Sequence, residues 1–175
     1  MRAPPYSERS VEYTIIFDAG QQSVPWWFPL IGVTLALLIV LVSLALYFAR
    51  HSSQVERGKA IVMFMLGLAL GLVWNFLVVP GISNDFTLCQ QALQNHAYSV
   101  VEGKVEDFSP SANISGHPPE RFTVQGVTFV YKDNPWFCGF NQTSSSGGPI
   151  HSNMVVRVSY LPYAMNKIVR LELRQ

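Results

Sequence analysis

The chain has 175 residues, of which 49% are apolar and only 13% are charged, whereas soluble domains usually carry about 25% charged residues. Two stretches, 26–49 and 60–84, contain no charged residue at all. From Gly81 to Gln175 the seven basic residues are balanced by seven acidic ones, so this part lacks the positive face that phosphate binding requires. We therefore expect a membrane protein with no nucleic-acid partner.

The N-terminal tail, residues 1–25, contains one strand-like run. Residues 11–17, Val-Glu-Tyr-Thr-Ile-Ile-Phe, are rich in β-branched and aromatic side chains and end at Asp18-Ala-Gly20. An unpaired apolar strand favours aggregation. The run therefore either joins a sheet elsewhere in the chain as an edge strand or stays separate, and the sequence leaves both possibilities open.

Two apolar stretches, 26–49 and 60–79, are each long enough to cross a membrane as a helix. A helix rises about 1.5 Å per residue, so about 20 residues cross a hydrocarbon core of about 30 Å. Pro80-Gly81 follows the second stretch and is predicted to end its helix. Because the link 50–59 is short, we expect an antiparallel transmembrane hairpin over residues 26–80, with the lipid bilayer around it.

The positive charges predict how this hairpin is oriented. The link carries Arg50, Arg57 and Lys59, whereas the stretch from Gly81 to Tyr98 carries no basic residue. Basic residues in short loops favour the cytoplasmic side of a membrane. We therefore expect the link in the cytoplasm and both chain termini outside it.

Small residues in the second apolar stretch indicate close helix packing. Gly67 and Gly71 form a G-x-x-x-G pair, which lets two helix backbones approach each other. We favour packing against the first helix of the same chain, and a homo-oligomer remains the alternative. Asn75 is the one strongly polar residue of this stretch, and without ionisable groups at mid-membrane a channel or transporter is not expected.

Residues 81–175 predict a small all-β domain with a short leading helix. Phe86, Cys89, Leu93 and Ala97 recur at helical spacing, and strand patterns follow at 98–108, 154–160 and 167–173. A further pattern over 120–131 predicts a hairpin that turns at Gln125-Gly126. The expected fold is thus a membrane α-helical hairpin plus an OB-like five-stranded barrel, with an SH3-like barrel as the alternative.

The reactive side chains indicate no catalytic or cofactor chemistry. Cys89 and Cys138 are the only cysteines, and outside the cytoplasm they form either a disulfide or two separate thiols. The histidines are far apart in sequence and none shows metal-ligand spacing. Glu102 and Glu106 alternate as solvent-facing strand residues. We therefore expect no enzyme, no metal and no cofactor.

The long loop 132–153 contains the candidate binding surface, which is Asn134 to Asn153. Its length exceeds what compact domains usually contain, and it holds Trp136, Phe137 and Phe140 among small polar residues. Aromatic side chains on a loop bind a partner, or alternatively they fill the end of the barrel. Both interpretations stay open, and Trp136 and Phe140 are the residues that we expect to contribute most to binding.

Several segments resemble a known family. They are 100–108 (Val-Val-Glu-Gly-Lys-Val-Glu-Asp-Phe), 122–129 (Phe-Thr-Val-Gln-Gly-Val-Thr-Phe), Gly139-Phe-Asn with Gly147-Gly-Pro149, and 169–173 (Val-Arg-Leu-Glu-Leu). Together they resemble uncharacterised bacterial two-helix membrane proteins with a C-terminal OB-like extracytoplasmic domain. The resemblance implies a bacterial inner-membrane location with both termini in the periplasm, and it implies no activity.

We therefore expect a membrane-anchored, non-enzymatic interaction module. The expected role is that of an accessory or assembly subunit whose partner is a protein in the membrane or outside it. The alternative is a domain that senses a small ligand or envelope stress.

Overall fold

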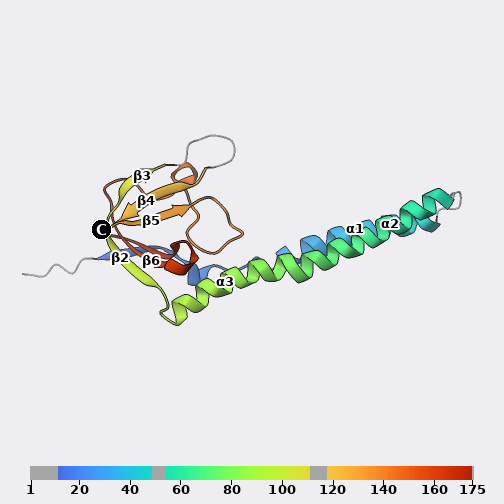
Figure 1. Ribbon diagram of the computed structural model, residues 1–175, viewed down its shortest axis with the longest axis horizontal. Coiled ribbons are helices and arrows are strands. Elements are labelled where there is room, and N and C mark those ends of the chain that lie inside the picture. Colours follow the sequence, from blue (N-terminus) through green and yellow to red (C-terminus); the bar gives the residue numbers. More distant parts are fainter. Residues whose placement is uncertain (1–11, 49–53, 111–117, 175) are drawn as a thin grey trace, which may run out of the picture. The chain divides into compact units, whose positions relative to one another are not determined.

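A computed structural model describes residues 12–48, 54–110 and 118–174 of the chain. Its residue contacts divide the protein into two compact units. One is Ser23–Thr87, which we call the helical unit. The other combines Met1–Gln22 with Leu88–Gln175, and we call it the β unit. Figure 1 shows the helices and strands of both. Arg50, which supported the predicted orientation, lies outside the described residues.

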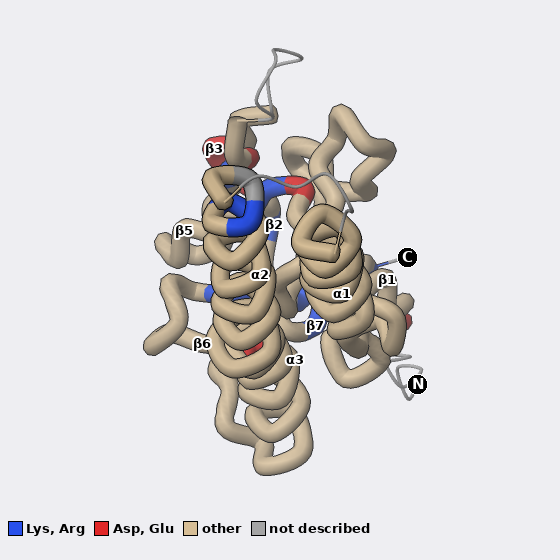
Figure 2. Tube along the Cα trace, turned by 90° about the vertical axis from the view of Figure 1, so that its right-hand side faces the viewer, with Lys and Arg blue, Asp and Glu red and all other residues tan. Residues whose placement is uncertain are grey.

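The helical unit contains the two predicted apolar helices. Helix α1 is Phe28–Phe48 and α2 is Gln54–Val73, and α2 leads through a π-helical turn, Trp74–Val78, into α3, Val79–Gln94. Two helices, over Phe28–Phe48 and within Arg57–Gln94, are long and apolar enough to cross a membrane. In Figure 2 the basic residues of α2 lie near its start, and neither α1 nor the part of α2 from Ala60 onward contains a charged residue. The prediction of two helices with the length and apolar character of membrane spans is therefore confirmed.

The two helices pack through their small residues. A Cβ atom on Gly67 would lie 3.0 Å from Ile39 Cγ2, and one on Gly71 would lie 3.0 Å from Ala36 Cβ. At Gly32 the indole ring of Trp74 occupies the space where a Cβ would be. The G-x-x-x-G pair therefore packs against α1 of the same chain, as its favoured interpretation predicted.

The predicted helix end at Pro80-Gly81 is wrong, because the helix runs on to Gln94. Proline lacks an N–H and its ring crowds the carbonyl four residues earlier, which usually ends or kinks a helix. Here the π-helical turn Trp74–Val78 lies directly before it, and such a turn widens the hydrogen-bond spacing to five residues. The changed spacing accommodates Pro80, and the leading helix of the β unit is the end of this same helix.

The β unit consists of two antiparallel sheets. One has the order β1-β7-β6-β2, formed by Tyr13–Asp18, Lys167–Arg174, Val155–Leu161 and Ser99–Lys104. The other has the order β3-β4-β5, formed by Glu106–Ser109, Glu120–Val124 and Val127–Tyr131. A common core fills the space between them, with Phe122, Phe129, Val158 and Leu171 fully buried. Figure 1 shows β4 and β5 side by side.

The N-terminal strand joins the β unit. Strand β1 pairs antiparallel with β7 and shifts register between Ile15 and Phe17. At its end the Asp18 carboxylate accepts hydrogen bonds from Arg170 Nη2 at 2.8 Å and from the Gly20 backbone N–H at 2.8 Å. Of the two possibilities that the sequence left open for this run, the structure contains the one in which it joins a sheet. The β unit is therefore discontinuous in sequence.

The strand predicted over 98–108 is interrupted at Val105. Strand β2 before it pairs with β6, and β3 after it pairs with β4, so each half belongs to a different sheet. The Val105 N–H donates to the Met154 carbonyl at 2.8 Å, which holds the corner against the start of β6. Among the described residues the two sheets do not close into the expected five-stranded barrel, and the fold is an open two-sheet β unit with seven strands.

Candidate functional site

The second half of the loop 132–153 is fixed by two carboxylates. Glu120, which is fully buried, accepts hydrogen bonds from the Ser144 backbone N–H at 2.9 Å and from its hydroxyl at 2.6 Å. Asp133 accepts from the Thr143 N–H at 2.8 Å and from its hydroxyl at 2.6 Å. Burial, together with the Glu120 carboxylate, raises the pKa of Tyr131. Thr143 and Ser144 therefore anchor this half of the loop to Glu120 and Asp133.

The three aromatic residues of the loop have different environments. Phe140 is only 6% exposed, and its ring lies 5.0 Å from that of Tyr131 and 5.5 Å from that of Phe17. It belongs to the core cluster and cannot present its ring to a partner. The expectation of Phe140 as a contact residue is therefore wrong, and its ring fills the interior of the β unit, which was the alternative interpretation. Trp136 is 36% exposed and Phe137 is 51% exposed, and both reach the surface.

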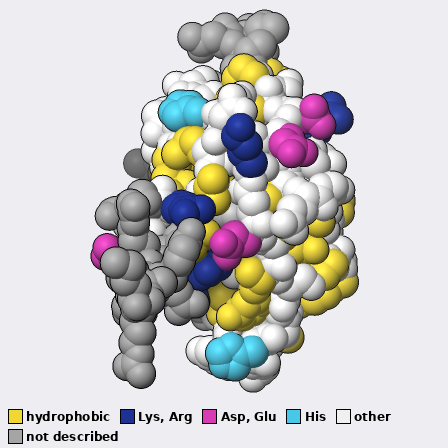
Figure 3. Space-filling model, turned by 90° about the vertical axis from the view of Figure 1, so that its left-hand side faces the viewer, with side chains coloured by type: hydrophobic (Ala, Val, Ile, Leu, Met, Phe, Trp, Pro, Cys, Tyr) yellow, Lys and Arg dark blue, Asp and Glu magenta, His cyan; other side chains and the backbone are white. Residues whose placement is uncertain are grey.

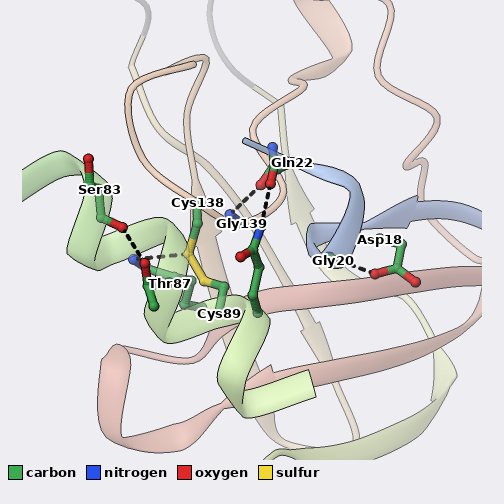
Figure 4. The surroundings of a disulfide bond; sticks show 10 residues. Asp18, Gly20, Gln22, Ser83, Thr87, Cys89, Cys138 and Gly139 are labelled. Atoms are coloured by element: carbon green, nitrogen blue, oxygen red, sulfur yellow. Dashed lines mark hydrogen bonds between the residues drawn. A yellow bond between two sulfur atoms is a disulfide. The ribbon is translucent and has the colours of Figure 1, made fainter. Parts of the chain in front are cut away.

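A disulfide holds the first half of the loop against α3. Cys89 and Cys138 lie at disulfide distance, with their Cα atoms 6.4 Å apart. Figure 4 shows the two sulfur atoms joined beside Gln22, whose side-chain oxygen accepts from the Gly139 N–H at 3.0 Å. The Gln90 side chain in turn donates to the Gln22 carbonyl at 2.8 Å. Of the two alternatives from the sequence, the structure contains the paired cysteines.

A groove opens beside this fixed corner, between the end of β5, the loop and the turn that leads into β7. Its volume is about 310 Å³. Its lining includes Val130, Lys132, Phe137, Met165, Lys167 and Ile168. We call this the β5–β7 groove. Phe137 is the one residue of the predicted binding set that both lines the groove and exposes a large part of its side chain.

Met165 is an unusual residue at the rim of the groove. It is 94% exposed, and its backbone has φ 54°, in the left-handed region that favours glycine. The next residue, Asn166, has φ 55° and donates from its side chain to the Thr128 carbonyl at 3.1 Å. A fully exposed apolar side chain on a strained backbone is not explained by packing, and such outliers concentrate at functional sites.

The groove is positively charged. It is lined by two lysines, Lys132 and Lys167, and by no carboxylate among the described residues. The Lys167 ammonium lies 3.8 Å from Cys138 Sγ. In Figure 3 acidic and basic side chains are scattered over one face of the molecule among apolar ones.

The outer face of the larger sheet carries a second polar cluster, which we interpret as structural. Glu102 accepts from the Tyr13 hydroxyl at 2.5 Å and from Arg157 Nε at 2.9 Å, and these hydrogen bonds lower its pKa. Arg157 also lies 4.0 Å from the Tyr13 ring centre and 3.5 Å from Glu172. The cluster ties β1, β7, β6 and β2 together across the sheet, and its side chains satisfy one another.

The part of the chain that the structure describes contains no clustered metal ligands. Within the described residues, no group of three or more His, Cys, Asp or Glu side chains converges on a possible metal position. Trp136 does not line the β5–β7 groove, although it is next to Phe137 in the chain.

Sequence reasoning missed five of the named groove residues, Val130, Lys132, Met165, Lys167 and Ile168. They come from segments whose proximity depends on the path of the loop, and no periodic pattern connects them. One signal was present in the sequence: methionine stands in the turn Pro-Tyr-Ala-Met-Asn, residues 162–166, where polar residues are usual.

Comparisons of the chain with protein-family models, with curated proteins and with solved structures find no match. The resemblance to bacterial two-helix membrane proteins therefore stays a prediction, and the function is argued from the site alone.

Proposed function

We propose that this protein is a membrane-anchored, non-enzymatic interaction module whose β unit binds a protein partner through the β5–β7 groove. The observation that carries the proposal is Met165, an apolar side chain exposed on strained backbone at the rim of an apolar groove. Phe137 supplies a second exposed apolar side chain, an aromatic ring on the loop. Large, flexible or aromatic apolar side chains in a concave site are typical of protein-binding surfaces.

The proposal includes location and orientation. The helical unit crosses the bacterial inner membrane, with the link between α1 and α2 in the cytoplasm and the β unit in the periplasm. The basic residues Arg57 and Lys59 at the start of α2 support this orientation, and a disulfide fits an oxidising compartment. The role proposed is that of an accessory or assembly subunit of a membrane complex.

Orientation is tested by labelling with a membrane-impermeant thiol reagent in intact cells. The variant Ser145→Cys places a thiol on the exposed loop of the β unit, and Gly58→Cys places one near the start of α2. We expect the first to react and the second to be shielded until the cells are opened. The reverse pattern would contradict the orientation.

Binding is tested by photo-crosslinking in native membranes. A photoreactive phenylalanine analogue replaces Met165 in one variant and, as a matched control, Val100, which is also exposed but lies on β2. We expect one discrete protein adduct from position 165 and none from position 100. The absence of an adduct at 165, or the same adducts at both positions, would refute the proposal.

A small-ligand sensor is the second candidate, because the groove volume lies at the lower end of the range of about 300–1,000 Å³ for ligand pockets. In that case position 165 would give no protein adduct, and the unmodified protein purified from native membranes would carry a small molecule that mass spectrometry detects.

A further inference from the structure

We infer that the occupant of the β5–β7 groove is an extended peptide segment of the partner, in which an apolar side chain stands beside acidic ones, bound along the free edge of β5. This inference rests on the proposed function and specifies the chemistry of the partner. Three features of the groove support it: its apolar lining, the backbone edge that it exposes and its charge.

The apolar lining selects a bulky apolar side chain. Val130, Phe137 and Met165 expose about half or more of their side chains around the groove, and Ile168 is buried beneath them. With about 30 Å³ per water molecule in the liquid, the groove holds on the order of ten waters. Replacing these waters by one or two apolar side chains of a partner removes apolar surface from water, and this drives association.

The register of the hairpin determines which backbone groups face the groove. Its two-residue turn, with Gln125 at φ 48° and Gly126 at φ 80°, closes on the pair Val124 and Val127. From this pair onward, antiparallel pairs alternate between those that exchange hydrogen bonds and those that do not. Phe129 and Tyr131 thus bond to β4, while Thr128 and Val130 direct their N–H and C=O groups away from it.

The side chain of Asn166 confirms this outward direction. It donates to the Thr128 carbonyl at 3.1 Å from the turn before β7, as a neighbouring strand would do. In the part of the chain that the structure describes, β4 is the only strand paired with β5. The N–H and C=O groups of Val130 are therefore placed to bond to the backbone of an added segment, the mode by which extended peptides join an open sheet edge.

The charge of the groove selects an acidic segment. Lys132, which follows β5, and Lys167, the first residue of β7, both line the groove, and no carboxylate lines it among the described residues. A peptide with basic side chains would be repelled, whereas acidic side chains that flank an apolar residue would be attracted. Electrostatic complementarity of this kind sets partner choice more than it sets raw affinity.

The test uses the full chain in detergent micelles and two capped octapeptides as probes, one of alternating Val and Glu and one of alternating Val and Lys. We expect the Glu peptide to bind about tenfold more tightly than the Lys peptide and to shift and protect the amide signal of Val130. The variant with Lys132→Gln and Lys167→Gln should lose this discrimination. Val100→Thr, outside the groove, should retain it.

Two further variants test the edge and the rim. Val130→Pro removes the outward N–H, which an edge strand tolerates, and should weaken binding of the Glu peptide, whereas Val130→Thr should not. Met165→Gly relieves the left-handed backbone, so it should keep the thermal midpoint while it weakens binding. The matched control Gln125→Gly relieves the same kind of strain outside the groove and should bind as the wild type does.

The outcomes separate this inference from the proposed function. Equal binding of the two peptides, or binding that is insensitive to both Val130→Pro and the lysine variant, overturns the inference. If the inference about the peptide is overturned but position 165 still crosslinks one protein, the proposed function stands without that inference. If position 165 crosslinks phospholipid, and vesicles of anionic phospholipid bind in place of the peptides, the groove contacts a membrane surface and both are overturned.

Discussion

The replacement Phe140→Ala distinguishes a core residue from a binding residue within one loop. The Phe140 ring is 6% exposed and packs 5.0 Å from Tyr131 and 5.5 Å from Phe17, and its backbone N–H donates to the Ile168 carbonyl at 3.0 Å. Truncating such a buried ring costs about 3–5 kcal/mol. Small domains have a total free energy of unfolding of about 5–15 kcal/mol, so we expect a loss of roughly a third of the stability of the β unit.

Phe137→Ala is the matched control, because it removes an identical ring from the same loop. Phe137 is 51% exposed, and surface substitutions usually change stability by less than about 1 kcal/mol. The assay is guanidinium unfolding of the full chain in detergent, followed by intrinsic fluorescence. The full chain is required since β1 reaches the β unit from before the hairpin. Equal, small shifts for both variants would refute the placement of Phe140 in the core.

Three further predictions concern the disulfide, the polar cluster and the helix packing. Replacing both Cys89 and Cys138 by alanine opens a loop with a sequence separation of 49 residues and should lower the free energy of unfolding by about 4 kcal/mol in the chain-entropy relation; a wild-type midpoint that is insensitive to reductant would contradict this. The hydrogen bonds that lower the pKa of Glu102 stabilise the fold while its carboxyl group is ionised. This stability is present at pH values above 4.5, the ordinary pKa of the group, and is lost as the pH falls through the lowered pKa. The decrease of the thermal midpoint at low pH should therefore be smaller in Glu102→Gln than in the wild type, and an equal decrease in both would contradict the role of the cluster. Gly32→Ala should weaken the hairpin because the indole ring occupies that space, whereas Gly58→Ala, with no atom within 4 Å, should not; equal thermal midpoints of the two variants in detergent would contradict the packing.

The two long apolar helices could be predicted from the sequence because their signal is strong and local. An uncharged apolar run of sufficient length has few other structures available to it. The helix end at Pro80-Gly81 could not be predicted in the same way, since a local rule for proline does not include the π-helical turn that accommodates it. The continued helix is also held by a distant residue, through the bond between Cys89 and Cys138.

The hairpin at Gln125-Gly126 was predicted for a similar reason. A two-residue turn with a glycine is a local signal, and the observed positive φ values at both positions match it. The predicted barrel is not confirmed, because closure depends on pairing between distant strands. The corner at Val105, held by a bond to Met154, divides one predicted strand between two sheets, and alternation of side chains alone does not reveal it.

The site was predicted only in part. The loop 132–153 and Phe137 were identified from composition and length, which indicate a surface but not which side chains point outward. Phe140 was assigned wrongly because irregular backbone has no period that separates buried from exposed positions. The groove itself depends on Met165 and Lys167, which the fold brings to the loop from another part of the chain.

The most direct test of the central claim, that the β5–β7 groove binds the partner, compares purifications from native membranes by quantitative mass spectrometry. One variant combines Phe137→Ser with Met165→Gly, and its control combines Ile15→Thr with Val100→Thr, two exposed apolar residues outside the groove. Both should keep the thermal midpoint of the β unit close to that of the wild type. We expect a discrete set of proteins to be lost from the groove variant and retained by the control. The same set of proteins with wild type, groove variant and control would contradict the claim.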